Sequence, residues 1–372
     1  MKKNRRWILW IILSLNILAV IPLLLSYVAG HVSPTENWYY AFFGLAYPIF
    51  LALNGFFIIL WLVLWKKYIF ISLISVITGW SSLQSVYPVH LPWAKKNFSG
   101  ETIRVVSYNV NLFWGNENTE SISEVREQIS SFLRNQQADV ICLQEGYLKG
   151  PDFNELLKKY THSIGMKYFY FKNYRKFWDK KKIDAVIIFS RFPIVDTGFM
   201  KIPEKSTFAI YADILHHEDT IRIYNLHLES IRFGNDDYTF YSGLTDPMKD
   251  KPPLKEGAQK MFWKLRRAFI LRANEADQLT SHISVCPYPS IIAGDFNDTP
   301  SSYTYHQLTR NHKDAFVSVG NTFDGNTYAG KFPAFRIDYL LYSVHFKPAG
   351  YHKYKLNLSD HYPIAASFTF KP

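Results

Sequence analysis

The sequence predicts an α/β domain that follows an N-terminal region of about three transmembrane helices. Residues 1–92 consist mainly of long apolar runs, whereas residues 101–372 alternate short apolar stretches with polar turns. A strand, a helix and a second strand follow one another at 103–143, at the spacing of a βαβ unit. We expect a transmembrane region at 1–92, a linker at 93–100 and a folded domain at 101–372.

Three apolar runs are each about long enough to cross a bilayer as a helix, at 7–28, 38–65 and 68–87. The third is weakened by polar residues near its end, Ser81, Ser82 and Gln84. A cleaved signal peptide is the alternative for the first run, but that run is long for a signal core and has no clear small-x-small cleavage site. The sequence therefore predicts a protein embedded in the membrane by several passes.

The basic residues near these runs predict how they cross the membrane. Four lie between Lys2 and Arg6, and Lys66 and Lys67 follow the second run, whereas the loop from Gly30 to Asn37 has no lysine or arginine. The positive-inside rule places the basic residues in the cytoplasm and everything after Tyr87 outside it, in the periplasm if the protein is bacterial. If the third run is only an interfacial helix, the domain is cytoplasmic instead.

The rest of the chain is mildly basic. Of 42 basic and 31 acidic residues, 36 and 30 lie in residues 93–372, a formal charge of +6. This charge is compatible with a phosphate-bearing substrate. Cys142 and Cys286 each lie in or beside an apolar run, and we expect buried free thiols with no disulfide framework.

The domain is organised around the stretch from Ser290 to Pro300, which reads SIIAGDFNDTP. Its apolar residues predict a short buried strand, and Gly294 allows a close approach of the backbone. Asp295 and Asn297, two residues apart at an extended strand end, can point the same way and offer oxygens that suit a hard divalent cation. A plain surface turn is the alternative.

Further elements are expected on both sides of this stretch. Ser121 and Glu124 predict a capping box for a helix to about Arg134, and the strand 139–143 ends in Gln144 and Glu145. Residues 230–257 are polar and predict an excursion over the surface. The remaining predicted elements are strands at 103–110, 185–189, 208–214, 221–228, 337–342 and 358–370, and a long helix at 258–283.

Aromatic and basic residues alternate between Lys167 and Lys182. Such a mixture can stack nucleic-acid bases or lie among lipid headgroups. An ordinary hairpin with one aromatic core face explains the pattern equally well.

Six short segments place polar residues at strand ends, in the order SYNV, LQE, NLHL, GDFN, RIDY and SDHYP, and together they cover residues 101–372. This set resembles the endonuclease/exonuclease/phosphatase superfamily, which includes DNase I, neutral sphingomyelinases and inositol polyphosphate phosphatases. The resemblance implies an α/β (α+β) fold, a four-layer sandwich of two mixed β-sheets flanked by helices. It also implies an active site at the edge where these strand ends meet.

The resemblance implies a divalent metal, usually magnesium, with manganese as an alternative. Asn109 and Glu145 match the positions that bind the metal, and Asp360, beside His361 in the SDH motif, is expected near the metal. The expected activity is hydrolysis of phosphoric esters.

The resemblance also implies catalytic roles. Asp295 and Asn297 match the pair that orients or activates the attacking water and holds the phosphoryl oxygens, and Asp338 matches the acid that aligns His361. His227 matches a second histidine of the DNase I, sphingomyelinase and inositol phosphatase branches, where abasic-site endonucleases typically have asparagine. Family mechanisms differ on whether His361 or Asp295 takes the proton from water.

These residue types suit the chemistry. A metal and hydrogen-bond donors offset the charge that grows on the phosphoryl oxygens, a histidine held by a carboxylate can accept a proton from water, and His227 is the candidate acid for the leaving group. Relatives often have a glycine just before the strand that begins at Ala185, whereas this chain has Asp184. No motif assigns a phosphate-contacting tyrosine or arginine, and Tyr170 and Arg191 are guesses for that role.

The expected substrate is a phosphodiester, either nucleic acid or a phospholipid or sphingolipid headgroup. The alternatives are a phosphomonoesterase of the inositol phosphatase type, a catalytically inactive relative that binds a phosphate-bearing ligand, and a transport or sensing unit built on the three spans. No acid or base within the spans supports the last alternative.

Overall fold

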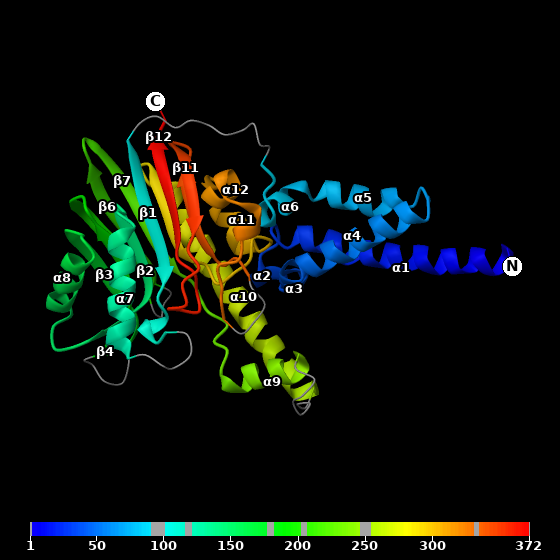
Figure 1. The fold of residues 1–372 in the computed structure, drawn as a ribbon, viewed down its shortest axis with the longest axis horizontal. Coiled ribbons are helices and arrows are strands. Elements are labelled where there is room, and N and C mark those ends of the chain that lie inside the picture. The colour runs from blue at the N-terminus through cyan, green and yellow to red at the C-terminus, as the bar shows by residue number, and fades with distance from the viewer. Residues whose placement is uncertain are drawn as a thin grey trace.

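The computed structural model describes residues 2–90, 101–115, 121–176, 182–201, 207–245, 254–330 and 335–371. Figure 1 shows a body of two β-sheets and their helices, from which a bundle of helices extends. The helices are α1 (Lys2–Val28), α2 (Pro34–Asn37), α3 (Tyr39–Leu45), α4 (Tyr47–Val63), α5 (Ile69–Thr78), α6 (Trp80–Val86), α7 (Ile122–Asn135), α8 (Phe153–Ser163), α9 (Asn235–Thr245), α10 (Leu254–Ser284), α11 (Tyr303–Leu308) and α12 (Ala315–Val319), with short 3-10 helices η2 (Asn111–Phe113) and η3 (Thr322–Asp324). The strands are β1 (Thr102–Asn109), β2 (Val140–Lys149), β3 (Tyr168–Lys176), β4 (Lys182–Ser190), β5 (Ile194–Lys201), β6 (Thr207–His216), β7 (Asp219–His227), β8 (Ser290–Asp295), β9 (His312–Asp314), β10 (Asp338–Ser343), β11 (Phe346–Lys353) and β12 (Ile364–Phe370).

The strands form two mixed sheets of six strands each. The first has the order β11-β12-β1-β2-β4-β3 and the second β5-β6-β7-β8-β10-β9. In each sheet the central pair is parallel: β1 is joined to β2 through α7, and β7 is joined to β8 through α9 and α10. The predicted α/β architecture is therefore confirmed.

The two sheets and their helices make four layers. Apolar residues of both sheets, among them Val105, Ile188, Ile223 and Leu340, form a core between the sheets. A second core lies between the first sheet and α7 with α8, and a third between the second sheet and α10 with α11. The outer faces of both sheets are thus covered by helices, as the predicted four-layer sandwich requires.

The predicted capping box is present at the start of α7. The Ser121 hydroxyl accepts a hydrogen bond from the Glu124 amide, and the Glu124 carboxylate accepts one from the Ser121 amide. The buried apolar residues of α7 are Val125, Ile129 and Leu133. Because they are four residues apart, they lie on one face of the helix, and this face packs against the first sheet.

In the described part of the chain, one helix is long and apolar enough to cross a membrane, Arg6–Val28. The second predicted span is two helices, α3 and α4, bent by 60° at Ala46, and the third is α5 and α6, bent by 71° at Gly79. Counting each bent pair as one span gives three. Figure 1 shows α1, α4 and α5 side by side, leading away from the sheets.

A buried polar network joins α1, α4 and α5. The Asn16 amide donates to the Ser72 hydroxyl at 2.6 Å and accepts from the Trp61 indole at 2.8 Å. Ser72 in turn donates to Asn54 at 2.8 Å, and Asn54 donates to the Ala19 carbonyl at 2.9 Å. Satisfied polar groups of this kind hold helices together where no water competes for them.

Several predicted boundaries are wrong. The strand expected at 139–143 continues to Lys149 through a bulge after Leu143, and the last strand begins at Ile364 instead of 358. The surface excursion expected at 230–257 contains α9 and the first turn of α10. Cys142 is buried as expected, but Cys286, just after α10, is partly exposed. The predicted linker 93–100 lies outside the described residues.

The basic aromatic stretch is a hairpin where it is described. β3 pairs with β4 in antiparallel register, and Phe169 and Phe171 pack against the core under α7 and α8. Tyr170 packs on the other side, against the core between the sheets. Residues 177–181, which include Phe177 and Trp178, lie outside the described part of the chain.

Candidate active site

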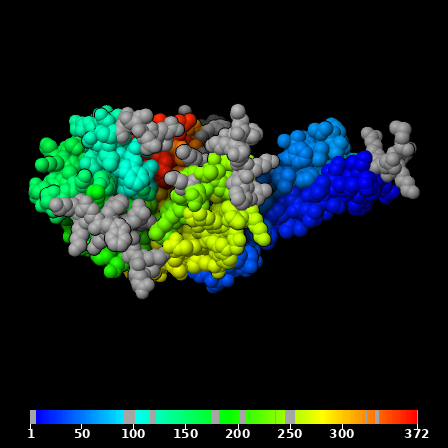
Figure 2. All heavy atoms as spheres, turned by 90° about the horizontal axis from the view of Figure 1, so that it is seen from below, coloured from blue at the N-terminus to red at the C-terminus, as the bar shows by residue number. Residues whose placement is uncertain are grey.

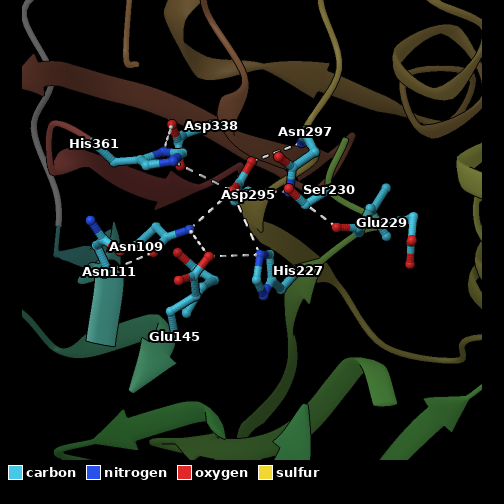
Figure 3. Close-up of polar contacts among 12 residues, drawn as sticks. Asn109, Asn111, Glu145, His227, Glu229, Ser230, Asp295, Asn297, Asp338 and His361 are labelled. Carbon is cyan, nitrogen blue, oxygen red and sulfur yellow. Dashed lines mark hydrogen bonds and ion pairs between the residues drawn. The ribbon is translucent and has the colours of Figure 1, made fainter. Parts of the chain in front are cut away.

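Register across three neighbouring strands brings three of the predicted residues together. His227 ends β7 opposite Asp295, which ends β8, and Asp295 lies opposite Asp338, which begins β10. Residues in register on adjacent strands point to the same side of a sheet. Figure 3 shows these side chains facing Asn109 and Glu145, which come from the first sheet.

Asp295 is at the centre of the group and is almost fully buried. Its carboxylate accepts hydrogen bonds from the Asn297 amide N–H at 2.8 Å, from Asn297 Nδ2 at 3.2 Å and from Asn109 Nδ2 at 3.0 Å. Asn297 reaches it from a left-handed backbone position, with φ of 53°, rather than as a continuation of the strand. The predicted convergence of Asp295 and Asn297 is present, but a tight turn produces it.

Gly294 holds this strand end against its neighbour. Its φ is 142°, and a Cβ there would lie 2.2 Å from the carbonyl oxygen of Leu226 on β7. Only glycine fits. The close approach expected at Gly294 is thus to the adjacent strand, which brings Asp295 and His227 side by side.

Glu145 enters the group from inside β2 and not from its end. The bulge after Leu143 gives Glu145 a φ of 53°, and this turns its side chain out of the pleat. Its Oε1 then lies 3.3 Å from Asn109 Nδ2 and 3.4 Å from His227 Nε2. About a quarter of the side chain is exposed, so this carboxylate forms the open side of the site.

Asn109 ends β1 and places its amide nitrogen between the carboxylates of Glu145 and Asp295. Its amide oxygen accepts the Asn111 N–H at 3.0 Å. Because the oxygen is the metal-ligand atom of an asparagine, a ligand role requires the amide plane to turn over. The two carboxylates already face a positively polarised group at this point.

His361 and Asp338 form a buried pair. His361 Nδ1 lies 3.0 Å from Asp338 Oδ2, and its Nε2 lies 3.8 Å from Asp295 Oδ2. Thr327 accepts the Asp338 amide N–H, and Ser359 accepts the His361 amide N–H. These contacts fix the ring so that one nitrogen faces Asp338 and the other faces the centre of the site.

Burial and charge shift the ionisation of this group. Burial raises the pKa of Asp295 to about 7, although nearby His361 acts in the opposite direction. Burial disfavours the charged form of His361, but Asp338 and Asp295 outweigh this and raise its pKa well above 6.5. The pair therefore favours an imidazolium at His361, which is the form a base reaches after taking a proton.

Asp360 acts on the group through its charge. Its carboxylate accepts a 3.4 Å hydrogen bond from the Ser359 hydroxyl, and its charge adds to the effect of Asp338 and Asp295 in raising the pKa of His361. Burial is the main cause that raises the pKa of Tyr328, and the charge of Asp360 adds to it. Tyr328 packs its ring against His361, with centroids 5.4 Å apart, and pairs with its backbone.

Sequence reasoning missed the residues that hold the site in place. Arg272 on α10 is buried, pairs with Asp298 at 3.1 Å and donates to the Glu229 carbonyl at 3.0 Å, so it ties together the chain after β7 and the chain after β8. Tyr328 and Thr327 were missed as well, because a single arginine on a helix and isolated threonine and tyrosine residues in a loop carry no pattern. Gln144, expected beside Glu145 at a strand end, instead bonds to Asn225 between the sheets.

Two groups in the described part of the chain have the spacing of metal ligands. One is Asp295, Asp338 and His361, and the other is Glu101, His216 and His217. The second group lies where β6 ends and β7 begins, at the opposite end of the strands from His227. Only the first coincides with the predicted site.

The model of the endonuclease/exonuclease/phosphatase family matches residues 106–361, well over half of the chain, and residues 6–86 match a domain of unknown function, DUF8431. No curated protein matches.

Solved structures share the fold. The endonuclease/exonuclease/phosphatase of Beutenbergia cavernae is 15% identical, with 72% of each chain covered and a TM-score of 0.53. A family protein of Leptotrichia buccalis is 15% identical over 72% of this chain and 100% of its own, with a TM-score of 0.50. TDP2 of D. rerio, solved with a single-strand DNA product, is 17% identical over 73% of this chain and 100% of its own, with a TM-score of 0.50.

These structures agree with the two mixed sheets described above, and the family match covers every residue of the site. The chain therefore belongs to the endonuclease/exonuclease/phosphatase family and is a metal-dependent phosphoric ester hydrolase.

Proposed function

We propose that the protein is a membrane-anchored hydrolase of phosphodiesters that uses His361, Asp338, Asp295, Asn297 and His227. The observation that carries this proposal is the buried His361–Asp338 pair, whose free ring edge faces Asp295 at 3.8 Å. In its neutral form the His361 ring, with its Nδ1–H held by Asp338, would present Nε2 as a base of fixed tautomer to a water molecule beside a phosphoryl group. Asp338 would stabilise the imidazolium that forms.

The residues present fit a divalent cation. Glu145 and Asp295 supply hard oxygen ligands that converge on Asn109 Nδ2, a position that already attracts positive charge. We propose Glu145 and Asp295 as ligands, joined by Asn109 if its amide turns over, with Asp360 near them. Magnesium, or manganese in its place, would offset the negative charge of the phosphoryl oxygens.

His227 is the proposed acid for the leaving group. It is buried, and its Nε2 lies 3.4 Å from Glu145 and 3.9 Å from Asp295, on the edge of the site where the side chains converge. Asn297 is held by Asp295 and by the Leu228 carbonyl, which its Nδ2 reaches at 3.0 Å. We propose that it positions the phosphoryl oxygens.

We also propose that residues 1–92 cross the membrane three times and that the domain, 101–372, lies outside the cytoplasm. Two features of the bundle support this. Lys66 and Lys67 follow α4 at the end far from the sheets, and the N-terminus of α1 is at that same end in Figure 1. The catalytic domain packs against the other end, where α2 and α3 lie. The positive-inside rule then orients the bundle.

The proposed reaction is tested by turnover of the full chain in detergent with magnesium. Bis-p-nitrophenyl phosphate is the diester and p-nitrophenyl phosphate the monoester, and the reaction runs in ¹⁸O-labelled water. We expect faster diester turnover, with label in the phosphate product because water attacks phosphorus. Preference for the monoester would favour the inositol phosphatase type of activity instead.

A further inference from the structure

Helix α9 and the first half of α10, residues 254–269, form an arm that leaves the body of the catalytic domain. Figure 1 shows this arm beside the end of the bundle where α2 and α3 lie, and Figure 2, seen from below, shows its yellow-green atoms against the blue atoms of the N-terminal helices. The two helices of the arm hold each other through ion pairs, Asp236 with Lys260 at 2.9 Å and Asp237 with Lys264.

Aromatic contacts fix the arm to the chain between α1 and α4. The Phe262 ring stacks on Phe42 of α3, with centroids 5.0 Å apart and an interplanar angle of 12°, and meets Trp38 edge-on at 5.3 Å. The Arg266 guanidinium lies over the Trp38 ring at 5.2 Å. Figure 1 shows α2 and α3 at the end of α1 nearer the sheets, so these contacts lie near that end of the apolar helix. Tryptophan, tyrosine and arginine are typical of the headgroup layer at that depth.

The arm, and α3 beside it, also expose bulky apolar side chains. Trp263, beside Phe262, and Leu244, near the end of α9, are each 51% exposed. Tyr39, which begins α3 directly after Trp38, is 60% exposed. Lys255 and Lys260 accompany them on α10. Bulky apolar residues with lysines, next to a transmembrane helix, are the composition of a segment that lies in a membrane interface.

The same arm borders the active site at its other end. Helix α9 follows β7 within eight residues of His227, and Glu229 accepts from Arg267 of α10 at 2.8 Å. Tyr238 of α9 hydrogen-bonds to Tyr328, whose ring packs on His361. The arm therefore connects the rim of the site to the level at which α1 enters the membrane.

We propose that the arm lies in the headgroup layer of the membrane that holds α1, and that the substrate is a phosphate ester carried by a lipid in that same leaflet. The proposal rests on the proposed function for hydrolysis and for the membrane placement. The oxygen of water forms a bond to phosphorus, the bond from phosphorus to the leaving oxygen breaks, and that oxygen takes up a proton as an alcohol is released. A hydrophobic tail keeps such a substrate at the surface beside the site, whereas a soluble ester gains nothing from the arm.

The test compares two esters with the same reacting group. The full chain is placed in phosphatidylcholine nanodiscs with magnesium and given hexadecyl p-nitrophenyl phosphate, which partitions into the bilayer, or ethyl p-nitrophenyl phosphate, which does not. The double variant Trp263→Ala with Leu244→Ser removes the exposed apolar groups of the arm. We expect it to lower kcat/KM for the hexadecyl ester about tenfold, the scale of one large apolar side chain, with less than about twofold change for the ethyl ester. Val285→Ser, at the other end of α10 and 77% exposed, is the matched control and should change neither.

A second measurement locates the arm without relying on turnover. Lipids brominated near the headgroup should quench a part of the tryptophan fluorescence that is missing from Trp263→Phe. Equal losses on both esters in the double variant, or a Trp263 signal that brominated lipids do not quench, would overturn the proposal. Failure of the wild-type chain to cleave either ester would instead contradict the proposed function, so the two failures are distinguishable.

Discussion

His361 and Asp338 form a buried pair in which Nδ1 of the ring lies 3.0 Å from the carboxylate, although the two residues come from segments associated with different sheets. Asp338 begins β10, and His361 precedes β12 in the other sheet. The pair thus joins the two sheets and sets which nitrogen faces the reacting atoms. Loss of the carboxylate leaves the ring free to adopt the other tautomer.

We expect Asp338→Asn to lower kcat roughly 10²- to 10⁴-fold with little change in KM, because the base loses its fixed tautomer and the stabilisation of its charge. Steady-state kinetics with bis-p-nitrophenyl phosphate measure this, and an unchanged thermal midpoint shows that the fold is intact. A kcat within about threefold of wild type would show that Asp338 does not position the base.

Magnesium should raise the thermal unfolding midpoint of the full chain, because it binds the folded site and not the unfolded chain. A concentration of about 100 times Kd stabilises by about 2.7 kcal/mol. Glu145→Gln should remove most of this shift, since a carboxylate ligand becomes neutral. Glu101→Gln, in the Glu101, His216 and His217 group at the other end of the strands, is the matched control and should keep the shift. The reverse pattern would place the magnesium site in that other group.

His227→Gln should affect esters according to their leaving groups. A poor leaving group needs a proton more than a good one does, so the loss in kcat should be greatest for the phenyl ester with the least acidic phenol. Rates for a series of substituted phenyl esters, compared between wild type and variant, give this dependence. His352→Ala, at an exposed position on β11, serves as the control. Equal losses across the series would argue that His227 positions the substrate without donating the proton.

Acid should destabilise the fold through His312, which is buried against the Ser290 hydroxyl at 2.8 Å. Burial lowers the pKa of His312 from 6.5 to about 4. Between these values the unfolded chain takes up a proton that the folded chain does not, so stability falls as the pH falls, by up to about 3 kcal/mol. His312→Gln should flatten this part of the curve of unfolding midpoint against pH. A curve parallel to that of wild type would contradict the assignment.

The polar network of the bundle should stabilise it measurably. Asn54→Leu removes the bonds to Ser72 and to the Ala19 carbonyl, and we expect a loss of about 1 kcal/mol. The midpoint of unfolding by sodium dodecyl sulfate reports this loss. Leu53→Ala, at a neighbouring exposed position, should have a smaller effect. A more stable Asn54→Leu bundle would show that the network serves specificity more than stability.

Several site residues could be predicted because they lie at the ends of buried strands. Asp295, His227 and Asp338 each stand where an apolar run begins or ends, and strand register alone brings them together. The two-residue spacing of Asp295 and Asn297 predicts that their side chains point the same way. They do so, but a left-handed turn at Asn297 produces this arrangement and not an extended strand.

Other features depend on tertiary packing and leave no local pattern. Glu145 reaches the site through a bulge, which the apolar run before it does not indicate. Helix α9 is poor in strong helix formers, and its place depends on the buried Phe240, which packs against Gly257 of α10. The contact of Phe42 with Phe262 joins residues 220 positions apart, a pairing that neither segment indicates by itself.

The most direct test of the central claim measures hydrolysis of bis-p-nitrophenyl phosphate by the full chain under three conditions: with magnesium, with EDTA, and with magnesium in the His361→Ala variant. We predict turnover only in the first, because both the metal and the base are required. Turnover that persists in EDTA, or in His361→Ala at a rate close to wild type, would contradict the requirement for both the metal and His361.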